Sequence, residues 1–274
     1  MAVNCKLLNN KLDITYDGEF EHRSRYTKKL AELCVEKYNI NYDFEFTVHT
    51  HDHESPEPNA YSFCTINKKY DECFPSFMFM GWPSSGCEDY EKTRTSFTTT
   101  QPLSEHIGWR GITSSNVRQS FLDLFKHNKN IFDIDVIHWA EKSPHFPFAM
   151  SDTGYKKTKN LLSYQDMINK WKYLIDIEGN GFSGRLPMLL NTCRIVFIVD
   201  RPWHEFWYDK LEPWVNHIPV KRDLSDLEEN YHRIQNDLRL QNFIRHQQKQ
   251  LANTYLTRDY ALKHIKSIIE RNKI

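Results

Sequence analysis

The stretch that most constrains the fold reads KYLIDIEGNGFSGRLPMLLNTCRIVFIVD and covers residues 172–200. An apolar run, a glycine loop, a short apolar segment and a second apolar run follow one another, an order typical of a βαβ unit in a parallel sheet. Gly179, Gly181 and Gly184 fit the pattern G-x-G-x-x-G, and Asp200 stands about where dinucleotide enzymes carry a ribose-binding acid. The stretch predicts an α/β fold with a phosphate-binding loop.

The glycine loop has more than one interpretation. Glycines and a helix N-terminus can bind the phosphates of any nucleotide, and Arg185 adds a cation that would stabilise a departing diphosphate. The helix expected at 185–191 is short and contains Pro187, which weakens the dinucleotide interpretation. A diphosphate site is favoured. An NAD-linked oxidoreductase, a non-catalytic nucleotide-binding domain and an ordinary tight turn remain as alternatives.

The rest of the chain alternates helical and strand patterns, with a boundary between two domains expected near residue 104. The expected elements are a helix at 26–38, a strand at 42–49, a loop and crossover at 75–102, a strand ending at Trp109, a polar turn at 110–116, a helix at 117–125, and strands near 131–139, 172–177 and 194–199. From Leu224 the pattern is helical, with Ser225 and Glu228 as a capping box. These elements predict parallel βαβ units.

Composition excludes several classes of protein. The chain has 274 residues, enough for one large or two ordinary domains, and 36 basic residues balance 36 acidic ones, so nucleic acid is not an expected partner. The start lacks the apolar core of a secretory signal, and the longest apolar run, 195–199, is too short to span a bilayer. Six cysteines contain no CxxC pair and are expected as thiols. A soluble, cytoplasmic protein is predicted.

Three segments resemble the signature of the CAP10-like glycosyltransferases, family 90. The run at 174–190 contains D-x-x-G-x-x-x-S-x-R, and Trp203, Glu205, Phe206, Tyr208 and LEPWVNHIPVKRDLSDLEE at 211–229 are similar to the family's YxxLxPWxHYxPVxxDLSDL stretch. Trp109-Arg110-Gly111, followed by Thr113, Ser114 and Arg118, is similar to FRGxxTxxxR. PSFMFMGW at 75–82 resembles P-x-x-x-F-x-x-W. The resemblance covers about residues 75–230.

This resemblance implies a GT-B architecture, in which two Rossmann-like domains face each other across a cleft. Residues 1–104, with a C-terminal helix at about 245–274, would form the acceptor-side domain, and residues 105–244 the UDP-sugar-binding domain. The implied reaction is an inverting, metal-independent transfer from a UDP-sugar to a hydroxyl of a glycan or sugar acceptor, with no further cofactor. The compact chain looks most like small bacterial and viral members, among them an algal-virus xylosyltransferase, which favours xylose over glucose.

The resemblance also suggests roles for individual residues. Asp52, preceded by His51 in EFTVHTHDHESP, is the expected general base that takes the proton of the acceptor hydroxyl. Glu205 is expected to accept hydrogen bonds from the ribose, and Trp203 and Tyr208 to line the nucleotide pocket. The full set expected to bind the donor is Arg110, Gly111, Thr113, Ser114, Arg118, Gly181, Phe182, Ser183, Gly184, Arg185, Trp203 and Glu205.

Two patterns suggest a metal site instead. His49, His51, Asp52 and His53 are similar to the H-x-H-x-D-H ligands of binuclear hydrolases, but the spacing is one residue short, and a solvated strand end is the plain alternative. Asp133-Ile134-Asp135 matches the DxD of metal-dependent GT-A transferases. Its position in an alternating run indicates a strand. No metal is therefore predicted.

Overall fold

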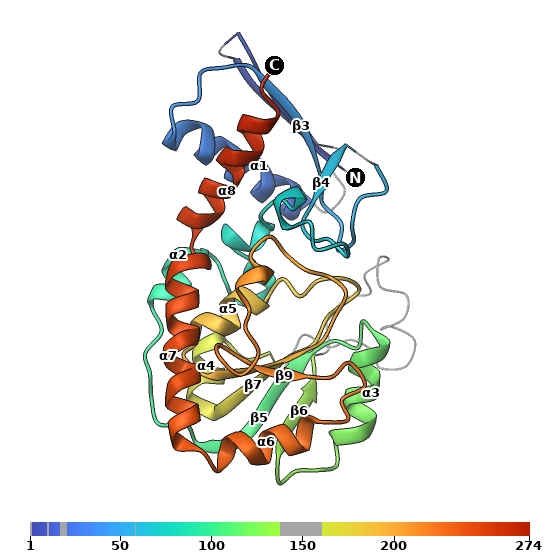
Figure 1. Ribbon diagram of the computed structural model, residues 1–274, viewed down its shortest axis with the longest axis vertical. Helices are drawn as coiled ribbons and strands as arrows, with labels where there is room; N and C mark the ends of the chain where they lie inside the picture. The colour runs from blue at the N-terminus through green and yellow to red at the C-terminus, as the bar shows by residue number, and fades with distance from the viewer. Residues whose placement is uncertain (1, 10, 17–20, 58, 138–160) are drawn as a thin grey trace. The chain divides into compact units, whose positions relative to one another are not determined.

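The computed structural model describes residues 2–9, 11–16, 21–57, 59–137 and 161–274 (Figure 1). It divides into two compact units, unit 1 (1–96, 202–211 and 251–274) and unit 2 (97–201 and 212–250). The first boundary therefore follows Ser96, before the position near 104 that the sequence suggested. A second difference concerns residues 202–211. The sequence analysis assigned them to the second domain, whereas they belong to unit 1.

Both units combine helices and strands. Unit 1 contains β1 (Ala2–Leu8), β2 (Lys11–Tyr16), α1 (Glu21–Lys37), β3 (Phe44–His49), β4 (Ala60–Ser62), the short helices η1 (Tyr70–Glu72), η2 (Phe77–Phe79) and η3 (Pro83–Ser85), α2 (Tyr90–Thr95), η4 (Tyr208–Lys210) and α8 (Arg258–Arg271). Unit 2 contains β5 (Ser104–Gly111), α3 (Asn116–Phe125), β6 (Phe132–Val136), α4 (Tyr164–Lys170), β7 (Trp171–Asp176), α5 (Leu186–Asn191), β8 (Ile195–Val199), β9 (Ile218–Val220) and α6 (Leu227–Gln235). Helix α7 (Leu238–Tyr255) begins in unit 2, and its residues from Leu251 count with unit 1.

The sheet of unit 1 is mixed, with the strand order β2-β1-β3-β4. Strand β1 runs antiparallel to both β2 and β3, and only β3 and β4 are parallel. The buried residues of β1 and β3, Val3, Cys5, Leu7, Phe44, Phe46 and Val48, alternate along each strand and form the core face. The expected Rossmann-like domain, which requires a parallel sheet, is therefore not the architecture of unit 1.

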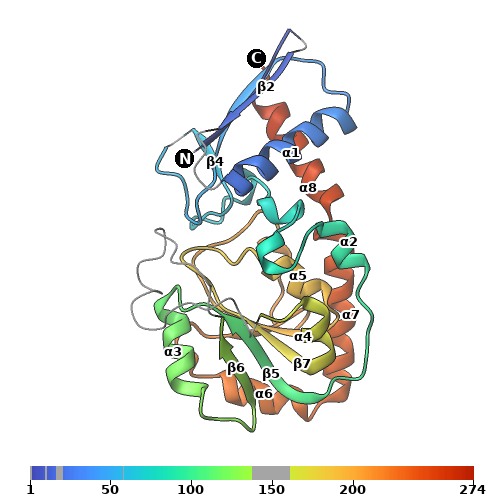
Figure 2. The same cartoon turned by 180° about the vertical axis from the view of Figure 1, so that it is seen from behind.

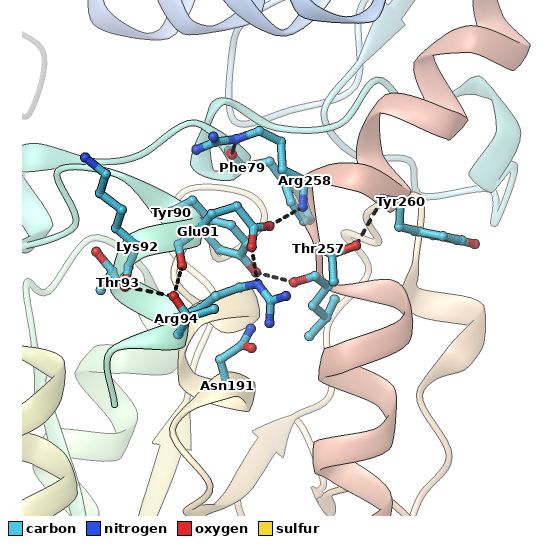
Figure 3. A network of polar contacts seen from close by, with 12 residues as sticks. Phe79, Tyr90, Glu91, Lys92, Thr93, Arg94, Asn191, Thr257, Arg258 and Tyr260 are labelled. Atoms are coloured by element: carbon cyan, nitrogen blue, oxygen red, sulfur yellow. Dashed lines mark hydrogen bonds and ion pairs between the residues drawn. The ribbon is translucent and has the colours of Figure 1, made fainter. Parts of the chain in front are cut away.

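Helix α8 is held in unit 1 by a polar network at its N-terminus (Figure 3). The Glu91 carboxylate accepts hydrogen bonds from the Arg258 backbone N–H (2.6 Å) and from Arg94 Nε (2.7 Å). The Arg258 guanidinium donates to the carbonyls of Phe79 (2.8 Å) and Met80 (3.2 Å) and to the Asp89 carboxylate (3.1 Å). One side chain thus joins α8 to η2 and to the N-terminus of α2.

We expect Arg258→Ala to lower the free energy of unfolding by about 2–3 kcal/mol, because the change leaves polar partners without their charged donor. Lys266→Ala on the same helix is the matched control. Its ion pair with Glu270 is exposed, and such pairs contribute little to stability. Urea unfolding of both variants measures the difference. Equal stability of the two variants would contradict this role of Arg258.

The sheet of unit 2 is parallel throughout, with the order β6-β5-β7-β8-β9 (Figures 1 and 2). Numbered within the unit, this is 2-1-3-4-5, one of the two common doubly wound orders. The sequence predicted these parallel βαβ units, and the strands expected near 131–139, 172–177 and 194–199 are β6, β7 and β8. The strand order changes direction between β5 and β7, and in such sheets ligands bind where the loops after these two strands meet.

Helices cover both faces of this sheet. Helices α3 and α6 pack on the face of Trp109 and Ile175, and helices α4 and α5 contact β7 and β8. The expected capping box of α6 is wrong. Asp226 is the N-cap, the Ser225 hydroxyl binds the Asp223 carboxylate, and Glu228 accepts a hydrogen bond from Asn128.

Two further results concern the described part of the chain. The six cysteines are free thiols, as expected. No described helix has the length and apolar character that crossing a membrane requires.

Candidate functional site in the doubly wound unit

The buried carboxylate of Asp176 organises the carboxyl end of β7. Ser183 Oγ donates to Asp176 Oδ1 (2.8 Å), Arg185 Nε donates to the same oxygen (3.2 Å), and Arg201 Nη1 donates to Oδ2 (2.7 Å). Arg201 also binds the Asp176 carbonyl through Nη2 (2.9 Å). The first, eighth and tenth positions of D-x-x-G-x-x-x-S-x-R are Asp176, Ser183 and Arg185. The spacing of the motif therefore reflects a direct contact of its polar residues.

Arg118 connects α3 to the end of β7. Its guanidinium donates to the carbonyls of Ile177 (2.9 Å from Nη2) and Ile112 (3.0 Å from Nη1) and to Ser114 Oγ (3.1 Å). Ser115, the N-cap of α3, donates to the Glu178 carbonyl (3.1 Å). The loops after β5 and β7 are therefore joined, and Arg118 and Ser114 are brought together there.

Positive charge is in excess at this strand end. Arg118, Arg185 and Arg201 act on one another and on Asp176, whereas the Glu178 carboxylate is bound by Arg222. Burial, and next the charge of Arg185, lower the pKa of Arg118 to about 9, so its charge is still present at neutral pH. An anion placed here would offset the mutual repulsion of these cations.

Arg185 has an unused donor at this place. Its Nε binds Asp176 and its Nη1 donates to the Arg110 carbonyl, but among the described residues its buried Nη2 has no hydrogen-bond partner. Buried polar groups nearly always have a partner, so an orphan of this kind requires an explanation. A cationic N–H of this kind is suited to an anionic oxygen.

Two predicted donor-site residues have other roles. The Arg110 guanidinium lies over the Trp171 ring (4.8 Å to the centroid) and binds the Asp133 carboxylate (2.7 Å), so it is not brought to the glycine loop. Hydrogen bonds from Lys170, Arg110 and Trp171 outweigh the effect of burial and hold the pKa of Asp133 well below its usual value. A Cβ at Gly111 would lie 2.5 Å from Trp109 Cζ2, so this glycine makes room for the indole ring.

The glycine loop also differs from a dinucleotide fingerprint. Among the described residues the left-handed glycines are Gly81 and Gly86, so the loop glycines do not use that conformation. Gly181, Phe182, Ser183 and Gly184 are buried, whereas Thr113 is half-buried. Helix α5 has only six residues and contains Pro187, which lacks an N–H. Arginine side chains, rather than a helix N-terminus, supply the positive charge, and Asp200 is exposed.

Candidate base in the mixed unit

The candidate base, Asp52, follows β3 in unit 1 and is bound by an arginine. Arg23 Nη1 lies 2.8 Å from Asp52 Oδ1 and donates to the Thr50 carbonyl (3.2 Å). The Arg23 side chain is 9% exposed and lies 5.3 Å from the Phe77 ring centroid, whereas the Asp52 side chain is 24% exposed. Arg23 therefore orients the Asp52 carboxylate, and part of the Asp52 side chain stays accessible to solvent.

The histidines of this segment do not form a metal site. The rings of His49 and His51 lie 4.5 Å apart, and the ring of His53 lies 5.2 Å from that of Trp203. In the described part of the chain, no three His, Cys, Asp or Glu side chains are grouped so that they could hold a metal ion. The binuclear-hydrolase alternative is not supported. Asp133 and Asp135 lie on β6, as their alternation predicts.

Trp203 and Glu205 belong to unit 1 instead of the donor-binding domain to which the sequence analysis assigned them. A backbone bridge between Thr65 and His204 attaches this segment to unit 1. Glu205 is fully buried, and its charge acts on Cys73 and Tyr90. Tyr208 lies in the same segment and stacks on His204 (5.2 Å between ring centroids).

Sequence reasoning missed four polar residues of the two groups, Arg23, Ser115, Asp176 and Arg201. Arg23 gave a signal: it occupies the stripe of α1 that contains Thr27, Leu30 and Cys34, all of which are buried. A charged residue on a buried stripe requires a partner. Asp176 stood in the quoted motif but received no role. Arg201 pairs with it across 25 residues of sequence, a separation that short-range periodicity does not predict.

The fold defines the class of this chain as an α/β protein with a doubly wound parallel sheet, and comparison with known proteins identifies its family. The sequence model described as glycosyl transferase family 90 matches residues 45–271. The chain therefore belongs to glycosyl transferase family 90, as the resemblance predicted.

The chain is similar to several curated protein O-glucosyltransferases. It is 33% identical over 119 residues to protein O-glucosyltransferase 2 of Danio rerio, which is 43% of this chain and 22% of that protein. Over 122 residues it is 35% identical to protein O-glucosyltransferase 1 of Rattus norvegicus (44% and 29%). It is 28% identical over 177 residues to O-glucosyltransferase rumi of Drosophila melanogaster (59% and 41%). The matched part is less than half of each relative.

Proposed function

We propose that the chain is a glycosyltransferase that moves a sugar from a UDP-sugar to a hydroxyl of a glycan or protein acceptor, with inversion and without a metal. Membership of family 90 and the names of the relatives support sugar transfer. The single observation that supports a diphosphate leaving group is the cluster of Arg118, Arg185 and Arg201 around one buried carboxylate. Cations fixed where negative charge develops lower the barrier of such a reaction.

In this mechanism Asp52 accepts the proton of the attacking hydroxyl, and Arg23 orients its carboxylate. As the glycosidic bond to the diphosphate breaks, the charge on the departing oxygen is stabilised by Arg185 through its unpaired Nη2. Asp176 and Ser183 fix the position of Arg185. Because no step requires a Lewis acid, the proposal needs no metal.

The sugar of the donor is part of the proposal. The resemblance to small bacterial and viral members of the family suggested xylose as the sugar of the donor. The names of the curated relatives now favour glucose. The two sugars differ by one CH₂OH group, which one side chain in the pocket can admit or exclude.

A thermal-shift panel with UDP, UDP-glucose, UDP-xylose, GDP and NADH, with and without EDTA, tests the proposal. We expect UDP and one UDP-sugar to raise the melting temperature whether or not EDTA is present, because a ligand that binds only the native state stabilises it by mass action. GDP is the control for a general response to diphosphates. A response to NADH alone would support the oxidoreductase alternative, and loss of the uridine response in EDTA would contradict the metal-free mechanism.

A further inference from the structure

Trp109 carries a second unpaired donor in unit 2. It lies near the carboxyl end of β5, its side chain is 1% exposed, and among the described residues its Nε1–H has no hydrogen-bond partner. The other two described tryptophans of the unit differ: Trp171 donates to Asp133 (2.9 Å), and Trp214 is only partly buried. A buried N–H without an acceptor is costly, so this one indicates a missing partner.

The position of the Trp109 ring is defined by its neighbours. The guanidinium carbons of Arg118 and Arg185 lie 5.9 and 5.8 Å from the Trp109 ring centroid. A Cβ at Gly111 would lie 3.0 Å from Trp109 Cε2, the ring atom bonded to Nε1. The indole therefore lies against the last residue of β5, at the strand end where the order of the sheet reverses, and beside the two arginines.

We propose that Trp109 Nε1–H binds a phosphate oxygen of the donor's diphosphate, beside Arg185 Nη2. This inference rests on the proposed function and adds a residue to the same site. The two unpaired groups are both donors, which suits a ligand that only accepts hydrogen bonds, as a phosphate oxygen does. The family pattern FRGxxTxxxR has Phe at this position, and Phe has no N–H.

Trp109→Phe removes the N–H and keeps an aromatic ring beside the arginines. We expect the Kd for UDP, measured by calorimetry, to rise about tenfold, the change expected for a hydrogen bond to a charged acceptor. Trp171→Phe is the matched control. It removes an indole N–H that binds Asp133 in the same unit, so it should lower the melting temperature but leave the Kd for UDP within about twofold.

A measurement on the unchanged protein accompanies the variants, in case Trp109→Phe does not fold. In ¹⁵N spectra of the wild type, the assigned Nε1–H signal of Trp109 should move downfield on addition of UDP, and that of Trp171 should not. Unchanged UDP affinity in folded Trp109→Phe, or an unmoved Trp109 signal at UDP saturation, would overturn the inference. In either case wild-type binding of UDP would leave the proposed function standing. A wild type that binds no UDP removes both.

Discussion

Asp52→Asn is expected to lower kcat for sugar transfer by about 10²–10⁴-fold and to leave the Kd for UDP unchanged, because an amide cannot take the proton of the acceptor hydroxyl. The amide keeps the shape of the carboxylate, so the Thr50 carbonyl and the Phe77 ring still hold Arg23. Single-turnover transfer from the preferred UDP-sugar measures the chemical step, and calorimetry measures UDP binding.

Glu54→Gln is the matched control for this variant. Glu54 lies two residues further along the same segment, and its carboxylate accepts a hydrogen bond from Thr65 Oγ1 (2.9 Å) within unit 1. We expect Glu54→Gln to keep kcat within a few-fold of the wild type. If Asp52→Asn also retained wild-type turnover, the base would be another residue, and Asp52 would only be the partner of Arg23.

Arg185→Met should raise the Kd for UDP by about 10–100-fold, since a hydrogen bond to a charged group contributes about 1.5–3 kcal/mol and each 1.4 kcal/mol is tenfold. Asp176 would keep its bonds to Ser183 and Arg201, so the loop should stay folded. Lys172→Met is the matched control. It removes a cation from the amino end of β7, where Lys172 pairs with Glu105. That control should bind UDP as the wild type does. Equal UDP affinity in the two variants would exclude Arg185 from the diphosphate site.

The doubly wound unit was the more predictable part of the fold. Its strand β8, Ile195–Val199, is a continuous apolar run, which is typical of parallel sheets buried on both faces. The resemblance identified family 90 from motifs that fold mostly into this unit, whereas the motif at 75–82 and the residues at 203–208 belong to unit 1. The facing GT-B arrangement stays a prediction, as do the roles of Asp52 and the donor-binding residues.

The mixed unit was harder to predict because its sheet is built from a hairpin that the sequence analysis overlooked. Residues 2–8 and 11–16 form β1 and β2, with Asn9 between them in a left-handed conformation (φ 49°). Asn tolerates this conformation and often marks a tight turn, so the signal was present. The contacts around Arg23, Asp176 and Arg201 join distant parts of the chain, and no periodicity reports them.

Unit 1 is assembled from three separate segments, with all of unit 2 between the first and the last. During synthesis, β1 to β4 leave the ribosome long before α8, whose Arg258 joins η2 and α2. While the parallel sheet is made, the nascent mixed unit therefore lacks the contacts of α8 with α1 and β3. Late closure across such long sequence separations is slow. The order of translation thus makes unit 1 the vulnerable part of the polypeptide.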